Sequence, residues 1–238
     1  SGTNVAGNAA ATPTAVSADG RYVLYESNAT NVVAGITDGN AGSDVFLFDR
    51  DNNVSILVSK ANAATTTGND TSRATALSPD GRYVLYQSRA TNLIAGFVNL
   101  NAGGDDVYLY DRTTATSRLV SREFGSTVRG ANAGATAVAL SDNGDRIVYY
   151  TSAGNLIGTG VSNGQSQAFV HQISTSTTRL ISHSISSETD LADGFSVPLA
   201  ISGDGSAVLF SSTGSTLVNG FVDGNGAAAD VYWHDTAT

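Results

Sequence analysis

The sequence predicts an all-β fold: a β-propeller of four repeats of about 61 residues, each forming one four-stranded antiparallel blade, with the last blade lacking its final strand. Three observations predict this fold. One phrase recurs four times along the chain, the strands it contains are apolar on both faces, and no segment shows the 3.6-residue apolar period of an amphipathic helix.

The repeat is marked by a short polar turn followed by an apolar strand. It reads SADGRYVLYES at 17–27, SPDGRYVLYQS at 78–88, SDNGDRIVY at 141–149 and SGDGSAVLF at 202–210. The turn glycines are separated by 61, 63 and 61 residues, at Gly20, Gly81, Gly144 and Gly205. A fixed period is the signature of repeat architectures. We therefore expect one domain over 1–238, with repeats at approximately 11–72, 73–135, 136–197 and 198–238.

The second repeat shows the expected strands most clearly. Tight-turn residues, Pro79-Asp80-Gly81, separate the first two strands, and the polar run DRTTAT separates the last two. The predicted strands are Thr75–Ser78, Tyr83–Ser88, Asp106–Asp111 and Arg118–Ser121.

Both faces of these strands are apolar. In YVLY, Tyr83 and Leu85 face one way while Val84 and Tyr86 face the other. An antiparallel sheet with one wet face would alternate apolar and polar residues, as in a two-layer sandwich. Strands covered on both sides instead predict small sheets that shelter one another, which is the arrangement of propeller blades.

The phrase SPDGRYVLYQS resembles the repeat signature of the TolB-like propellers, bacterial relatives of the WD-repeat propellers. Their unit runs Ser-Pro-Asp-Gly-Arg/Lys, then an apolar strand, then a strand that ends in Asp, as at Asp49, Asp111 and Asp235. The third repeat departs from the pattern, with Asn143 in the turn and Gln172 in place of the Asp. The resemblance covers nearly the whole chain and implies the propeller fold. It does not imply a function, because propellers host many unrelated roles.

The chain begins with Ser and contains no Met, so we expect it to be a piece of a longer protein. Three arrangements stay open. They are a compact four-blade ring with an imperfect last blade, which we favour, an open half of an eight-blade ring, and two chains that complete one ring. Ring completion by another chain or by missing parts of the parent chain is thus an expected partnership.

Composition excludes several function classes. Net charge is −9 and the only lysine is Lys60, so there is no basic stripe for nucleic acid and little attraction to anionic lipid. No apolar run reaches the ~20 residues of a membrane-spanning helix, which argues against membrane insertion. Few lysines and many Ser, Thr and Asn residues suggest an extracytoplasmic bacterial protein, whether periplasmic, secreted or on the cell surface.

The loop before the third strand of each repeat carries candidate calcium ligands. Oxygen donors alternate with glycines and a carboxylate closes the loop, which are ingredients of a calcium site, although the spacing does not match an EF-hand. The alternative, which we favour, is that these Asp and Asn side chains form Asx-turns. The candidate ligands are Asp38, Asn40, Asp44, Asn99, Asn101, Asp105, Asp106, Asp223, Asn225 and Asp230.

Several other residues could carry chemistry. An asparagine row at equivalent repeat positions, Asn31, Asn92 and Asn155, could line a ligand-binding surface or cap turns. His171 and His234 take the place of Phe48 and Tyr110, so we expect them to fill an aromatic slot, whereas His183 has no evident partner. We expect Trp233 to be buried, and we regard the Gly160-to-Gly164 match to Gly-x-Ser-x-Gly as accidental, because no helix follows it.

Two function classes remain. The first is a non-catalytic propeller that binds or scaffolds a protein, peptide or glycan, and the dominance of structural repeats favours it. The second is a propeller hydrolase or lyase acting on a polysaccharide or peptide. An acid–base site must differ between blades, yet the divergence in the third repeat removes charge at Gln167 and Gln172. A histidine beside a carboxylate would favour the enzyme.

Overall fold

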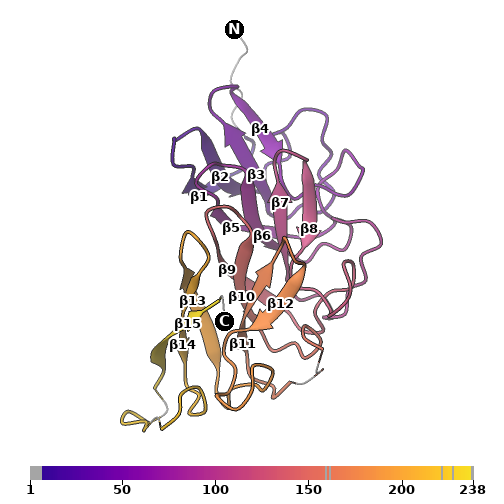
Figure 1. Cartoon of the computed structure of the whole chain (residues 1–238). Coiled ribbons are helices and arrows are strands. Elements are labelled where there is room, and N and C mark those ends of the chain that lie inside the picture. Colours follow the sequence, from indigo (N-terminus) through magenta and orange to yellow (C-terminus); the bar gives the residue numbers. More distant parts are fainter. Residues whose placement is uncertain (1–6, 159, 161, 221, 227, 237–238) are drawn as a thin grey trace. The chain divides into compact units, whose positions relative to one another are not determined.

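The structure is a computed structural model that describes residues 7–158, 160, 162–220, 222–226 and 228–236. Within these residues it is all β, and every strand pairing between neighbouring strands is antiparallel (Figure 1). The described residues form no helix long and apolar enough to cross a bilayer.

Four sheets follow one another along the chain, one for each repeat. In each sheet the strands lie side by side in chain order, which confirms the predicted blades, and within the described residues the last sheet has three strands, as predicted. The first sheet holds β1 (Ala11–Val16), β2 (Tyr22–Ser27), β3 (Asp44–Asp49) and β4 (Val54–Leu57). The second holds β5 (Ser72–Leu77), β6 (Tyr83–Ser88), β7 (Asp106–Asp111) and β8 (Thr116–Leu119). The third holds β9 (Ala135–Leu140), β10 (Arg146–Thr151), β11 (Gln167–Gln172) and β12 (Thr177–Leu180). The fourth holds β13 (Ser196–Ile201), β14 (Ala207–Ser212) and β15 (Asp230–Asp235).

Two predicted strands of the second repeat are shifted. The strand expected at Thr75–Ser78 is β5, Ser72–Leu77, and the strand expected at Arg118–Ser121 is β8, Thr116–Leu119. β5 ends before Ser78, whose backbone N–H still donates to Tyr83 O, because the Ser78 hydroxyl accepts the N–H of Tyr83 at 2.8 Å and donates to Asp80 Oδ1 at 2.6 Å, which starts the turn. β5 extends further toward the N-terminus because pairing with β6, rather than side-chain hydrophobicity, holds it there.

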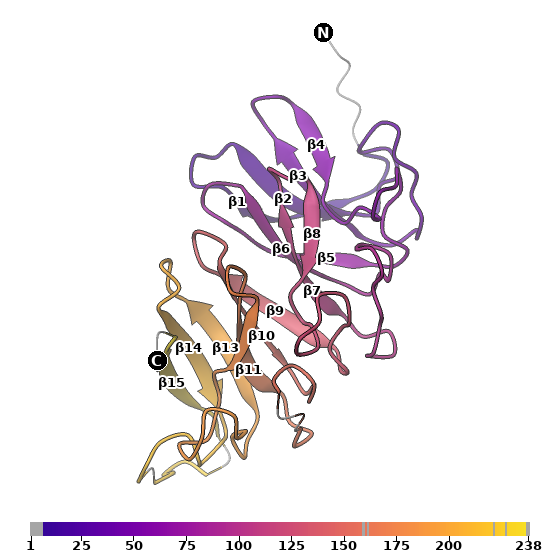
Figure 2. The same ribbon diagram turned by 45° about the vertical axis from the view of Figure 1, so that its right-hand side comes forward.

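The chain divides into two compact units, Ser1–Phe97 with Tyr108–Arg118, and Val98–Val107 with Leu119–Thr238. The single domain expected from the repeat stays a prediction. In the first unit, β5 packs against β1, β2 and β3 of the preceding sheet. In the second unit, β13 packs in the same way against β9, β10 and β11 (Figure 2).

Burial on both faces of the central strands confirms the reasoning from the apolar pattern. Val84, Leu85 and Tyr86 are successive residues of β6, and each is 0% exposed. Between the third and fourth sheets a core cluster joins Val148, Ala168, Val170, Ile181, Val208 and Phe210. Within each unit, the two consecutive sheets thus bury their facing sides against each other, which stabilises each blade through its neighbour.

The expected burial of Trp233 is wrong, since its side chain is 68% exposed. Its equivalents Leu47 and Val170 are 0% and 4% exposed. Those positions lie on a sheet face that the following blade covers, and no further sheet follows β15 in the described residues. The repeat position of Trp233 is buried only where a following blade covers it.

Candidate functional site

The predicted asparagine row lies in loops and fills a capping role. Asn31 Oδ1 accepts the backbone N–H of Asn8 at 2.8 Å, and Asn92 Oδ1 accepts that of Asn69 at 2.9 Å. Asn155 Oδ1 accepts the N–H of Asn132 at 2.9 Å. Each side chain therefore ties its own blade together, and ligand binding by this row stays a prediction.

The acidic loops contain Asx-turns. Asp38 Oδ1 accepts the backbone N–H groups of Asn40 and Ala41, both at 3.0 Å, and Asp223 Oδ1 accepts those of Asn225 and Gly226. The equivalent Asn99 accepts the N–H of Asn101 at 2.9 Å. In the described part of the chain no group of three or more His, Asp or Glu residues could hold a metal ion. Calcium binding stays a prediction of the sequence.

In the first and second repeats, the carboxylate that closes the loop is buried against a serine. Ser59 Oγ donates to Asp44 Oδ1, and Ser121 Oγ donates to Asp106 Oδ1, both at 2.9 Å. Burial raises the pKa of Asp44 to about 6 and that of Asp106 to about 7, although the hydrogen bonds from these serines lower both pKa values in part. The third repeat places neutral Gln167 at this position, and its Oε1 accepts from Ser182 at 2.7 Å.

Side-chain amides in the first of these loops and at the start of β11 reach the next blade. Asn40 Nδ2 donates to the carbonyl oxygens of Gly68 and Asp70, at 2.7 and 3.1 Å. Gln167 Nε2 donates to the carbonyls of Ala192 and Gly194, which hold the same repeat positions one blade later. We call the pair of hydrogen bonds from one side-chain amide to two carbonyls of the next blade the amide clasp. It joins consecutive blades within each unit.

The remaining sequence candidates are resolved as follows. His171 is 2% exposed and its Nδ1 lies 2.9 Å from Thr178 Oγ1, in the slot that an aromatic ring fills in other blades. The expectation that His183 lacks a partner is wrong, because its ring packs edge-on against His234 with centroids 5.3 Å apart. Ser162 donates to Ser152 O and has no helix after it, while Val161 lies outside the described residues.

The feature that sequence reasoning missed is a row of basic residues, each of which lines a groove within one unit. A basic residue follows the serine after the fourth strand in three repeats: Lys60, Arg122 and His183. Each forms an isolated antiparallel bridge, with Thr67, Gly130 and Leu191 respectively. The recurring pairs Ser-Lys, Ser-Arg and Ser-His were visible in the sequence and could have identified the row.

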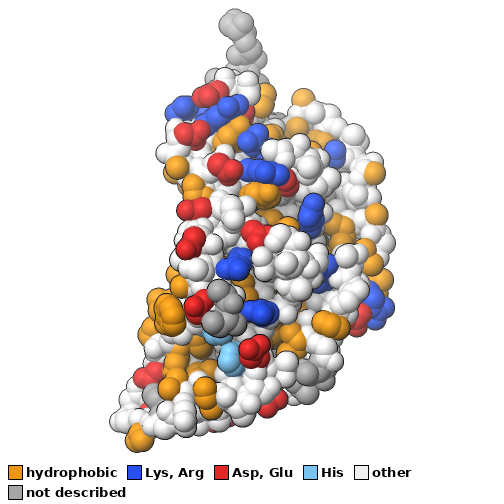
Figure 3. Space-filling model, viewed as in Figure 1, with side chains coloured by type: hydrophobic (Ala, Val, Ile, Leu, Met, Phe, Trp, Pro, Cys, Tyr) orange, Lys and Arg blue, Asp and Glu red, His pale blue; other side chains and the backbone are white. Residues whose placement is uncertain are grey.

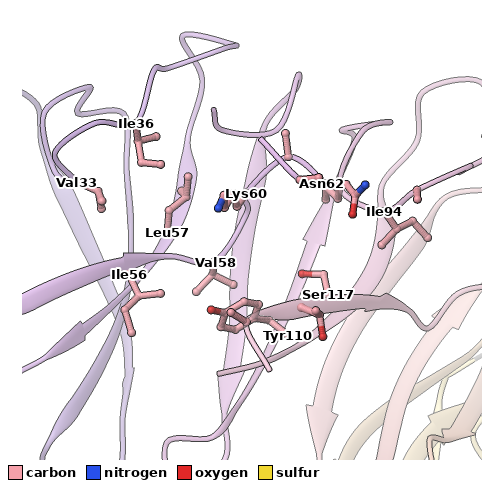
Figure 4. A pocket seen from close by; sticks show the side chains of 16 residues that line it. Val33, Ile36, Ile56, Leu57, Val58, Lys60, Asn62, Ile94, Tyr110 and Ser117 are labelled. Atoms are coloured by element: carbon pink, nitrogen blue, oxygen red, sulfur yellow. The ribbon is translucent and has the colours of Figure 1, made fainter. Parts of the chain in front are cut away.

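The groove of the first unit, which Lys60 lines, has a volume of about 650 Å³ (Figure 4). The edge strands β4 and β8 contribute to its walls through Ile56, Leu57, Thr116 and Ser117. Figure 4 shows Lys60 between Val33, Ile36 and Leu57 on one side and Asn62 and Ile94 on the other. Most of the side chains that line the groove are apolar, and its wall also includes the phenol of Tyr110.

Lys60 is the only charged residue among those that line this groove, all of which the structure describes. Its side chain is exposed and within the described residues it makes no ion pair. A backbone hydrogen bond of 2.8 Å from Asn62 N to Asn92 O joins the two loops beside it. The groove therefore offers one unneutralised ammonium group on a braced backbone.

The two grooves of the second unit differ from the Lys60 groove because their basic side chains contact other groups of the protein. Arg122 is 9% exposed, and its guanidinium donates to Ser176 O. Their volumes are about 490 and 210 Å³. In the smaller one, burial and the nearby His183 both lower the pKa of His234, and Glu188 lines the same cavity. This places two histidines and a carboxylate around one small cavity.

Solved structures of other proteins share this arrangement of sheets. A structure from a study of two prolyl endopeptidases matches 97% of this chain with 11% identity and a TM-score of 0.53. The chain has a β-propeller fold. TolB from Acinetobacter baumannii matches 88% of the chain at 16% identity, with a TM-score of 0.44. An oligogalacturonate lyase in complex with manganese matches 90% at 13% identity, with a TM-score of 0.42.

This propeller chain spans 41% of the TolB chain and 28% of the endopeptidase chain. No family model matches it, and no curated protein matches it in sequence. At these identities the comparisons establish the fold alone.

Proposed function

We propose that this propeller is a non-catalytic, extracytoplasmic binding module that holds an extended peptide segment in the Lys60 groove. The observation that carries the proposal is a groove of about 650 Å³, lined mostly by apolar side chains, with a single, unpaired ammonium group. Concave, mainly apolar sites with a few polar anchors are typical of binding sites.

The edge strands support an extended ligand. β4 and β8 are each the last strand of their sheet, so in the described part of the chain each leaves one row of backbone hydrogen-bonding groups without a strand partner. An extended peptide can add to such an edge while alternate side chains enter the groove. A glycan would need more hydroxyl and amide partners than Asn62, Tyr110, Thr116 and Ser117 provide.

Charge supports a ligand with one acidic group. Lys60 can form a charge-assisted hydrogen bond with a carboxylate, which is stronger than a neutral one. The chain as a whole carries −9, so a peptide with many acidic groups would be repelled at long range. The best ligand therefore has one carboxylate flanked by apolar residues.

The test is an array of eight-residue peptides that alternate apolar residues with one Glu, each beside its Gln counterpart, read by fluorescence anisotropy. Binding of Glu peptides should weaken about tenfold in Lys60→Gln, the loss of one charge-assisted hydrogen bond worth ~1.4 kcal/mol. Lys60→Arg should retain binding, and Arg118→Gln, outside the groove lining, is the matched control. Equal binding of Glu and Gln peptides, or no effect at Lys60, would contradict the proposal.

A second candidate is a hydrolase or lyase in the smaller cavity of the second unit. The observation that favours it is the grouping of His183, His234 and Glu188 around one cavity, since a histidine beside a carboxylate can act in acid–base catalysis. Turnover of peptide or polysaccharide substrates that is lost in both His234→Phe and Glu188→Gln would establish this function in place of simple binding.

A further inference from the structure

The exposed face of the last blade carries an inference that is independent of the Lys60 groove. Four apolar side chains of the fourth sheet are strongly exposed: Leu199 at 48%, Leu209 at 40%, Val231 at 65% and Trp233 at 68%. Leu209 pairs directly with Trp233 across β14 and β15. Hydrophobic side chains gather over β13–β15 on the side of the molecule that Figure 3 shows. We call this surface the trailing face.

The repeat shows what such a face is built to contact. In the third blade the equivalents of Leu209, Val231 and Trp233 are Val148, Ala168 and Val170, which are 0%, 0% and 4% exposed. They are covered by the opposite face of the next blade, through Val208 and Phe210. A trailing face is therefore matched to the leading face of a blade of the same kind.

The first blade presents an uncovered leading face. Its equivalents of Val208 and Phe210 are Val23 and Tyr25, which are only half-buried, and Val16 is 60% exposed. Ile201, the equivalent of Val16 in the fourth blade, packs against the core cluster instead. One chain thus carries both halves of a blade-to-blade contact.

Each surface also carries one half of an amide clasp: the trailing face has the side-chain amide, and the leading face of the first blade has the carbonyls. Asn40 Nδ2 bonds to Asp44 and to two carbonyls of the next blade, whereas its equivalent Asn225 Nδ2 bonds to Asp230 Oδ1 at 3.1 Å within its own loop. The carbonyls that correspond to those of Gly68 and Asp70 in the first repeat belong to Gly7 and Ala9. A copy placed with its first blade on the trailing face would bring these carbonyls to Asn225.

We propose that the trailing face binds the leading face of the first blade of a second copy of this chain, head to tail. The contact repeats the blade-to-blade packing already present within each unit, including its amide clasp. Such a heterologous contact either closes into a ring of copies or continues as a chain of them.

The size of the faces predicts weak association. Three strands spaced about 4.8 Å apart and six residues long, at about 3.3 Å per residue, give a flat face of roughly 300 Å² per partner. Stable complexes bury about 800 Å² per partner. Association should therefore depend on concentration, and a covalent trap is the suitable test.

The chain has no cysteine, so introduced ones react alone. Stacked sheets lie about 10 Å apart, beyond the reach of a disulfide, so the trap is a short bis-maleimide of about that length. A copy carrying Trp233→Cys is mixed with a differently tagged copy carrying Val23→Cys. The proposal predicts a cross-linked heterodimer, at least fivefold above the yield for the control pair Ile185→Cys and Val23→Cys, in which Ile185 is equally exposed but lies on neither face.

A chain that carries both cysteines distinguishes a second copy from the first blade of the same chain. Cross-links between chains support a second copy, whereas a link within one chain would show that the chain covers its own face and would overturn the proposal. Asn225→Leu should reduce the heterodimer yield, and so should Val231→Asp. Circular dichroism of both variants must match the parent, since an unfolded variant would lose the cross-link for another reason. A yield equal to the control pair would also overturn the proposal.

Discussion

Ser121 Oγ donates a hydrogen bond of 2.9 Å to Asp106 Oδ1, and the same hydroxyl accepts the backbone N–H of Val107 at 2.9 Å. The carboxylate is 2% exposed, and its other oxygen accepts from Asn101 Nδ2 at 3.0 Å. Asp44 and Ser59 repeat the arrangement in the first blade. The first and second blades thus each bury a carboxyl group where the third repeat has a neutral amide.

Ionising these two carboxyls should destabilise the fold. Because burial raises the pKa of Asp106 to about 7 and that of Asp44 to about 6, the folded state favours their protonated forms. This contribution to stability is fully present below about pH 4, the unfolded pKa, and is lost as pH rises toward 7. Asp106→Asn should flatten the decrease in unfolding free energy between pH 4 and 7 and add roughly 1–4 kcal/mol at pH 8.

Chemical denaturation at a series of pH values measures this effect. Asp70→Asn, at an exposed position, is the control and should keep the slope of the parent. An unchanged slope in Asp106→Asn would show that this carboxyl is ionised in the folded state without cost.

The ion pair between Arg82 and Asp111, beside the turns of the second blade, should contribute a small interaction free energy between β6 and β7. Arg82 donates to both carboxylate oxygens of Asp111, at 3.1 and 2.7 Å, and lowers the pKa of that carboxyl to about 2. Since Arg82 is 41% exposed, a double-mutant cycle with Arg82→Gln and Asp111→Asn should give only about 1 kcal/mol, and less at high salt. The third repeat reverses the polarity, with Gln172 Nε2 donating to Asp145 at 3.0 Å. The combination Arg82→Asp with Asp111→Gln should therefore be more stable than Arg82→Asp alone.

Backbone strain in a hairpin turn predicts a stabilising substitution. Ala115 has φ of 53°, in the left-handed region that costs L-residues about 1 kcal/mol and glycine little. Ala115→Gly should raise the unfolding free energy by about 0.5–1 kcal/mol. Ala95→Gly, in an exposed loop without positive φ, is the control and should not stabilise. Destabilisation by Ala115→Gly would contradict the strain assigned to this turn.

Calcium should have little effect on thermal stability. The Asp38 carboxylate is occupied by two backbone N–H groups, and Asp44 accepts from Ser59 and from Asn40. Melting curves with calcium and with chelator should coincide. A rise of several degrees with calcium, abolished in Asp38→Asn, would establish the metal site that the loop composition suggests.

The sequence was sufficient to predict the four blades, because turn chemistry and apolar burial on both faces recur in every repeat. Strand ends were less predictable, since Ser72 and Thr116 join their strands through backbone pairing, which leaves no hydrophobic signal. Trp233 could not be placed from its equivalents, because its burial depends on a neighbour rather than on its own strand. The Lys60 groove could not be predicted from the sequence because its walls combine loops from two repeats. Its one sequence signal is the basic residue that recurs after Ser59, Ser121 and Ser182.

The most direct test of binding in the groove uses the fact that Lys60 is the only lysine. Reductive ¹³C-methylation gives one lysine signal in NMR, separate from that of the terminal amine. Titration with a Glu-containing peptide should shift this signal to saturation, while its Gln counterpart should shift it far less. A lysine signal that stays fixed while the peptide binds would contradict the assignment of the ligand to this groove.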